Sequence, residues 1–94
     1  MVNRGEKNSI SPAQCRAARA WLGWSQEDLE RRSGIAKRTI ARYEQEATVA
    51  YEGTLTAISH AFERAGVALL FDGSEASGIA AEQKARGPLR RDRN

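Results

Sequence analysis

Three basic side chains near the middle of the chain are the strongest candidates for chemistry. Lys37 and Arg38 are neighbours, and Arg42 follows four residues after Arg38. In a helix, Ile40 and Tyr43 would face inward and the three cations would point away from them. Lysine and arginine donate to phosphate oxygens and to the O6 and N7 acceptors of guanine. The set therefore indicates either a nucleic-acid interface or the solvated face of an amphipathic helix.

The sequence offers little to a catalytic or metal site. It contains one cysteine, Cys15, and one histidine, His60, which excludes an internal disulfide and leaves no ligand set for zinc. No nucleophile with a matching histidine and acid, no pair of carboxylates in a pocket and no phosphate-binding glycine loop can be recognised. We therefore predict that the protein is not an enzyme and uses no cofactor or metal.

Charge is distributed unevenly along the chain. The 94 residues carry 15 lysines and arginines against 12 aspartates and glutamates, and this net charge of +3 identifies no partner by itself. Residues 54–83 contain four acidic residues and one basic residue, whereas residues 84–94 contain five basic residues and one acidic residue. A basic tail of this kind is typical of a solvated chain end, and a binding arm is the alternative.

Length and hydropathy predict one small cytoplasmic domain. Chains divide into several domains only well above this size. The longest apolar run covers residues 67–71, much shorter than the roughly 20 residues that a membrane span needs. No stretch near residue 1 has the apolar length of a signal peptide. We therefore expect no contact with a membrane.

Serine, threonine and glycine residues mark the ends of short helices. Ser11 followed by Pro12 is a typical helix start, and Gly23 is a typical end. Ser25 predicts the start of a second helix, and Thr54 predicts the start of a fourth. These signals predict helices over residues 12–22, 26–32, 36–45 and 55–65, with a loop over residues 46–53.

A short strand is predicted after the helices. Val67–Phe71 is apolar and precedes Asp72 and Gly73, which favour a turn. The strand needs a partner, either residues 88–90 of the same chain or the same strand of a second subunit, and residues 74–86 would form a loop or a weak helix. The expected organisation is a flexible N-terminus over residues 1–9, a helical domain over 10–66, a strand over 67–72, and a loop with a mobile basic tail over 73–94.

The second and third helices carry a specific pattern. Leu29, Gly34 and Ile40 are separated by five and six residues, which lets two short helices pack at a steep angle across a tight turn. Together with residues 16–29 and 34–44, this pattern resembles the Xre-type, Cro- and lambda-repressor-like helix-turn-helix family over about residues 10–67. The resemblance implies an all-α fold, a bundle of four to five helices, here followed by the short C-terminal β-strand.

The resemblance also implies roles for individual residues. The recognition helix, residues 36–45, would enter the major groove of DNA, with Lys37, Arg38 and Arg42 facing the base edges. Thr39 and Arg16 would hold phosphates, and Gln26 would either bond a phosphate or brace a recognition side chain. The resemblance further implies a partly buried ion pair between Arg19 and Glu44, which would link the first helix to the third.

Three residues depart from the family pattern. Glu30 stands where alanine is usual, so its carboxylate must reach solvent or a cation such as Arg31 or Arg38. Glu46 stands where glycine is usual, so the end of the third helix should run on or be strained. Ala36 replaces a serine or threonine cap, at a cost of about 1 kcal/mol.

The predicted function is sequence-specific binding of double-stranded DNA by a small bacterial-type transcriptional regulator at the nucleoid, a repressor or an activator. A homodimer on two half-sites is expected, because one helix buries little surface. Its surface would be the fourth helix, the strand or both. The alternative is an antitoxin-like or adaptor-like protein-interaction module with secondary DNA binding, favoured if Trp21 and Phe71 form an exposed apolar patch.

Overall fold

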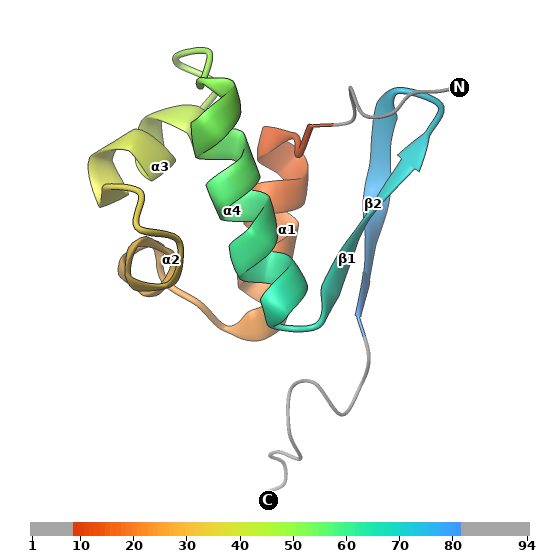
Figure 1. The fold of residues 1–94 in the computed structure, drawn as a ribbon, viewed down its shortest axis with the longest axis horizontal. Coiled ribbons are helices and arrows are strands. Elements are labelled where there is room, and N and C mark those ends of the chain that lie inside the picture. Colours follow the sequence, from red (N-terminus) through yellow and green to blue (C-terminus); the bar gives the residue numbers. More distant parts are fainter. Residues whose placement is uncertain (1–8, 82–94) are drawn as a thin grey trace, which may run out of the picture.

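The computed structural model describes residues 9–81, which form four helices followed by a two-stranded antiparallel sheet (Figure 1). No fifth helix occurs among these residues, so the bundle has the smaller of the two expected helix numbers. The elements are α1 (Pro12–Leu22), α2 (Gln26–Ser33), α3 (Lys37–Glu44), α4 (Glu52–Arg64), β1 (Val67–Asp72) and β2 (Glu75–Ala81).

The ends of α1 and α2 are fixed by local hydrogen bonds, as the sequence predicted. The side chain of Ser11 accepts from the Gln14 amide, and Ser25 accepts from Asp28, each forming a capping box. Gly23 and Gly34 follow the two helices in the left-handed conformation, which glycine adopts without a steric penalty. Short-range signals therefore determine where these two helices begin and end.

The starts of α3 and α4 lack such signals. Ala36 precedes α3 without a side-chain cap, as its replacement of serine or threonine implied. The expectation that Thr54 caps α4 was wrong, because the helix begins at Glu52, three residues before the predicted start at residue 55. The Leu55 amide donates to the Tyr51 carbonyl over 3.0 Å, so Tyr51 is the N-cap residue and Thr54 lies inside the first turn.

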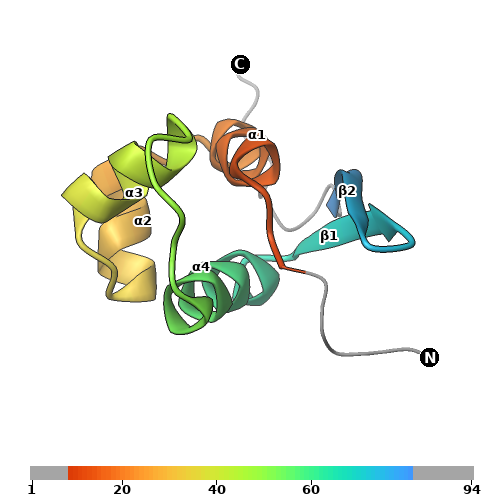
Figure 2. The ribbon, with the colours of Figure 1, turned by 90° about the horizontal axis from the view of Figure 1, so that it is seen from above.

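One hydrophobic core joins all four helices to β1. In both ribbon views, α2 and α3 lie on one side of α1 and α4, and the two strands lie on the other (Figures 1 and 2). Near the α1–α2 loop, Trp24 stacks on Phe62 with ring centroids 5.7 Å apart. The buried apolar residues are Ile10, Cys15, Ala18, Leu29, Ile40, Tyr43, Ile58, Ala61, Phe62 and Val67.

The partner of β1 differs from both candidates that the sequence suggested. β1 pairs with β2, in a segment for which a loop or a weak helix was expected. Gly73, with φ of +66°, forms the tight turn between the strands. An irregularity follows Leu70, where the pairing skips one residue of β2. Residues 88–90, the other intrachain candidate, lie outside the described residues.

A single glutamine attaches the sheet to α1. Gln14 is 3% exposed, and its amide nitrogen donates to the carbonyl oxygens of Leu70, over 2.8 Å, and Gly78, over 2.9 Å. Its amide oxygen accepts from the Ser11 backbone over 3.0 Å. An isolated two-stranded hairpin is only marginally stable in water. These bonds, together with packing against α1 and α4, hold the hairpin in place.

We predict that Gln14→Leu weakens the attachment of the hairpin. The substitution keeps the bulk of the side chain but leaves two strand carbonyls without their buried donor, which costs about 1–3 kcal/mol. Urea unfolding should show this loss, and amide hydrogen exchange should be faster in β1 and β2. The matched control is Gln45→Leu, at an exposed site. Equal stability of the two variants would contradict the role assigned to Gln14.

The end of α3 places a glutamate in an unfavourable backbone conformation. The amides of Glu46 and Ala47 donate to the carbonyls of Tyr43 and Arg42, each over 2.9 Å. This pattern is a Schellman motif, in which the residue after the helix cap adopts a left-handed conformation and is usually glycine. Glu46 has φ of +60° and is the one non-glycine residue with positive φ among residues 9–81. The departure noted in the sequence therefore appears as backbone strain.

We expect Glu46→Gly to stabilise the protein by about 1 kcal/mol. A left-handed conformation costs a residue with a side chain roughly 1–2 kcal/mol, part of which the greater freedom of glycine in the unfolded chain offsets. Thermal and urea unfolding measure the gain. Glu46→Ala is the control, because it removes the side chain and its 3.8 Å pair with Arg16 but keeps the strain. A similar gain in both variants would show that the side chain, and not the backbone, is responsible.

Candidate nucleic-acid interface

The exposed side of α3 carries the three cations singled out in the sequence. Lys37, Arg38 and Arg42 are all exposed, and Thr39 is half-buried. Among residues 9–81, Arg38 and Arg42 form no ion pair. The opposite side of the helix is buried in the core through Ile40, Tyr43 and Glu44.

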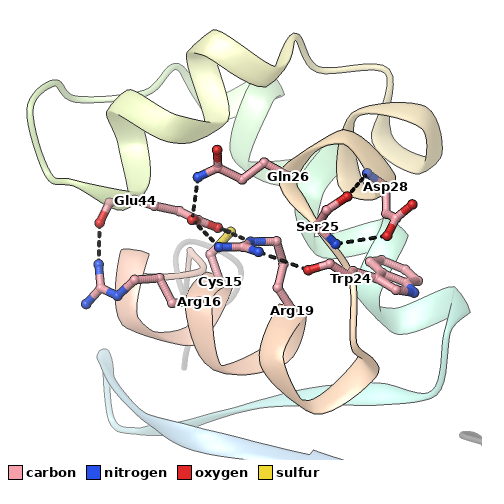
Figure 3. A network of polar contacts seen from close by, with 8 residues as sticks. All are labelled: Cys15, Arg16, Arg19, Trp24, Ser25, Gln26, Asp28 and Glu44. Atoms are coloured by element: carbon pink, nitrogen blue, oxygen red, sulfur yellow. Dashed lines mark hydrogen bonds and ion pairs between the residues drawn. The ribbon is translucent and has the colours of Figure 1, made fainter.

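A buried carboxylate fixes the orientation of α3. Glu44 is 4% exposed and receives four hydrogen bonds from α1 and α2 (Figure 3). Arg19 donates two of them, from Nε to Oε2 and from Nη2 to Oε1, both over 2.7 Å. Gln26 Nε2 donates to Oε1 over 3.0 Å, and Cys15 Sγ donates to Oε2 over 3.1 Å. We call Cys15, Arg19, Gln26 and Glu44 the Glu44 network.

The network keeps Glu44 ionised. Burial raises the pKa of a carboxyl group, but the hydrogen bonds from Arg19, Cys15 and Gln26 outweigh this effect and hold the pKa of Glu44 below its ordinary value. Burial and the neighbouring carboxylate raise the pKa of the Cys15 thiol, so Cys15 acts as a neutral donor. Arg19 also donates to the Trp24 carbonyl over 2.9 Å, which ties the α1–α2 loop to the same network.

Two consecutive residues in the first turn of α2 hold the two ends of α3. Gln26 bonds Glu44, the last residue of α3, as part of the Glu44 network. Glu27 Oε2 accepts from the ammonium group of Lys37, the first residue of α3, over 2.7 Å. The C-terminal end of α3 is therefore fixed by a buried carboxylate, whereas its N-terminal end carries an exposed ion pair.

Arg16, on α1, contacts the C-terminal end of α3. Its guanidinium donates to the backbone carbonyl of Glu44 (Figure 3) and lies 3.8 Å from the carboxylate of Glu46. A cation at this position compensates the partial negative charge of the helix end. Of the residues assigned to phosphates, Arg16 and Gln26 thus bond α3, whereas Thr39 lies on α3 itself.

Glu30 is partly exposed to solvent and does not pair with either of the expected cations. The side chain is half-buried, and it forms no ion pair with Arg31 or Arg38 within the described part of the chain. Arg31 instead pairs with Asp28. The negative charge of Glu30 contributes to raising the pKa of Lys37, after the larger effect of Glu27.

Sequence reasoning missed three contacts of this arrangement. These are the hydrogen bonds of Cys15 and Gln26 to Glu44 and the ion pair of Glu27 with Lys37. Glu27 and Lys37 have opposite charges and stand at the starts of two successive helices, a signal that could have suggested their contact. No comparable signal connects Cys15 or Gln26 to Glu44, because those contacts depend on how the helices cross.

The comparisons with known proteins are consistent with this geometry. A protein-family model described as helix-turn-helix matches residues 16–65, which is more than half of the chain. No curated protein matches the sequence. In the described part of the chain, no group of three or more acidic, histidine or cysteine residues could hold a metal ion, and no helix is long and apolar enough to span a membrane.

We predict that the Glu44 network makes stability sensitive to acid. Because the pKa of Glu44 is lower in the folded than in the unfolded state, its contribution is present above the unfolded value of about 4.3 and is lost as pH falls through the folded value. Glu44→Gln should cost about 3 kcal/mol at neutral pH, since it leaves Arg19 without its charge partner. Urea unfolding from pH 7 to pH 3 should therefore show a shallower pH dependence in Glu44→Gln than in the wild type.

The control for this measurement is Glu63→Gln, which removes an exposed carboxylate from α4. It should leave both the stability at neutral pH and the slope below pH 5 close to those of the wild type. A wild-type slope in the Glu44→Gln variant would show that the acid sensitivity arises elsewhere.

Proposed function

Since this chain belongs to the Xre/Cro-type helix-turn-helix family, we propose that it binds double-stranded DNA in a sequence-specific manner and acts as a small transcriptional regulator. The observation that carries the proposal is the presentation of α3. Its inner side is fixed through the buried Glu44, while Arg38 and Arg42 project from its exposed side without a carboxylate partner among residues 9–81.

An exposed helix such as α3 fits the major groove. An α-helix with its side chains is about 10–12 Å in diameter, and the major groove is about 12 Å wide and admits one helix. Arg38 and Arg42 are one helical turn apart, so their guanidinium groups can reach neighbouring base pairs. Each can donate two hydrogen bonds to the O6 and N7 atoms of a guanine. We assign base recognition to these two residues.

The remaining residues of the site divide into phosphate contacts and supports. The family resemblance places Lys37 at the base edges, but its ammonium group is held by Glu27 at the first turn of α3. We propose instead that Lys37, like Thr39 in the same turn, donates to a phosphate oxygen, as side chains and backbone amides at a helix start can. Arg16 and Gln26 bond Glu44, and we propose that they contribute to DNA binding mainly by positioning α3. A phosphate contact from either residue would add to this positioning.

We propose that the protein acts as a homodimer, a repressor in the cytoplasm at the nucleoid. A single small module buries only about 600–1,000 Å² on DNA, and two modules on paired half-sites supply the contacts that selective binding requires. The candidate dimer surfaces are the exposed side of α4 and the free strand edges of the hairpin. In the ribbon views the hairpin lies on the far side of the molecule from α3, with α1 and α4 between them (Figures 1 and 2).

The apolar patch that the adaptor-like alternative required is not exposed in the described part of the chain, although Val49 and Tyr51, in the loop before α4, are. The patch would include Trp21 and Phe71, yet both side chains are half-buried. Trp21 packs against the core, and Phe71 lines a groove between α4 and β1. We therefore keep DNA binding as the single proposal.

We predict that duplex binding weakens steeply with salt and depends on Arg42. Phosphate contacts release counterions, so the logarithm of affinity should fall linearly with the logarithm of salt concentration. Arg42→Ala should cost about 1–3 kcal/mol on the preferred sequence and relax its selectivity. Selection from a random duplex pool supplies that sequence, and fluorescence anisotropy measures the affinities.

The matched control is Arg64→Ala, at an exposed site at the far end of α4. It removes one hydrogen bond to the Arg32 carbonyl at the end of α2, so urea unfolding must verify its fold, and it should leave selectivity unchanged. Two inverted half-sites in the selected sequences would support the homodimer. Absence of duplex binding even at low salt would overturn the proposed function.

A further inference from the structure

One of the three cations on α3, Lys37, is paired with a carboxylate in the free protein. The ammonium group of Lys37 lies 2.7 Å from the carboxylate of Glu27, whereas Arg38 and Arg42 have no such partner within residues 9–81. The side chains of Lys37 and Glu27 are 50% and 53% exposed. The pair therefore lies at the surface, on the side of the molecule where DNA would approach.

We propose that Glu27 sets the affinity of the protein for DNA by holding Lys37 in the free state. This inference rests on the proposed function and adds a regulatory element to the same site. Before Lys37 can bond a phosphate fully, it must exchange the carboxylate of Glu27 for the phosphate oxygens. Glu27 thus lowers affinity without contacting a base.

The fixed position of α2 makes this competition unavoidable. Gln26, the residue before Glu27, bonds the buried Glu44, and Ser25 and Asp28 close the capping box at the start of the same helix. The backbone of Glu27 therefore cannot withdraw when DNA binds, and only its side chain can rotate. If Glu27 kept its bond to Lys37, its carboxylate would stand next to a phosphate, and like charges at this distance repel.

Both groups are charged at neutral pH, as the competition requires. The hydrogen bond from Lys37 lowers the pKa of Glu27, and the same bond raises the pKa of Lys37. Because the two side chains are exposed, their attraction is weak enough for a phosphate to displace it. The pair therefore attenuates DNA binding instead of abolishing it.

The test is the affinity of Glu27→Gln for a duplex of mixed sequence of about 20 base pairs, which spans two turns of DNA. A phosphate contact is independent of sequence, so no operator is needed. Exposed ion pairs of this kind correspond to about a two- to fivefold effect, and we expect Glu27→Gln to bind more tightly by that factor. The salt dependence should steepen by about 0.9 in slope, the contribution of one additional phosphate contact.

A double-mutant cycle separates the proposed competition from simple repulsion. If Glu27 acts by holding Lys37, then Glu27→Gln should have no effect in a Lys37→Gln background. If it acts only by repelling phosphate, the gain in affinity would be the same in both backgrounds, and the inference would be wrong. Glu63→Gln on α4 removes an equal charge away from the interface and should change affinity little.

The remaining outcomes also distinguish the two proposals. Tight binding by the wild type together with unchanged affinity in Glu27→Gln would overturn the role of Glu27 and leave the proposed function intact. Failure of both proteins to bind the duplex at low salt would overturn the proposed function, and this inference with it. Urea unfolding of each variant verifies that the compared proteins are folded.

Discussion

The arrangement of the helices depends on the requirement that a buried carboxylate be satisfied. A charge as deeply buried as that of Glu44 destabilises a protein unless opposite charge and hydrogen bonds surround it. Here the donors come from two different helices, α1 and α2, so the carboxylate can be satisfied only when both helices meet the end of α3. Apolar packing of Ile40 and Tyr43 supplies the driving force for burial, but it tolerates small rotations. The hydrogen bonds of Glu44 permit only one orientation, and that orientation determines which residues of α3 face outward.

Features that depend on neighbouring residues could be predicted from the sequence, and features that depend on distant ones could not. The ends of α1 and α2 follow from Ser11, Gly23 and Ser25, whose bonds reach three or four residues along the chain. The start of α4 could not be found in this way. Threonine is a common cap residue, but the backbone carbonyl of Tyr51, not Thr54, accepts the first helical hydrogen bond. Strain at Glu46 was one of two outcomes expected there, and it was expected only because the family pattern has glycine at this position.

The second strand, β2, also depends on residues that are distant in the sequence. β2 is rich in alanine and glycine and has little intrinsic preference for a strand. It forms because β1 supplies the ladder and because Gln14, more than 50 residues away along the chain, bonds carbonyls of both strands. In the candidate site, the pairing of Arg19 with Glu44 came from the family resemblance. The contributions of Cys15 and Gln26 required the crossing geometry of the helices.

The formal charge of the chain gives a poor picture of the positive surface it offers. Arg16 and Arg19 are directed to the end of α3, and Arg31 and Lys37 each meet a carboxylate. Four cations have no carboxylate partner among residues 9–81. Arg38 and Arg42 lie on α3, whereas Arg32 stacks over the Trp24 ring and Arg64 donates to the Arg32 carbonyl. A net charge of +3 neither predicts nor excludes this distribution, because it does not separate paired from unpaired cations.

The placement of Gln14 beside the residues that hold α3 has a consequence for how the molecule unfolds. Gln14 anchors the hairpin, while Cys15 and Arg19, on the same helix, bond Glu44. The sheet and the α2–α3 pair lie on opposite sides of the molecule and are separated in the sequence by α4. Both nevertheless depend on α1 being formed. Loss of α1 would release them together, so neither can persist as an independent subdomain. We therefore expect residues 9–81 to unfold in a single cooperative transition.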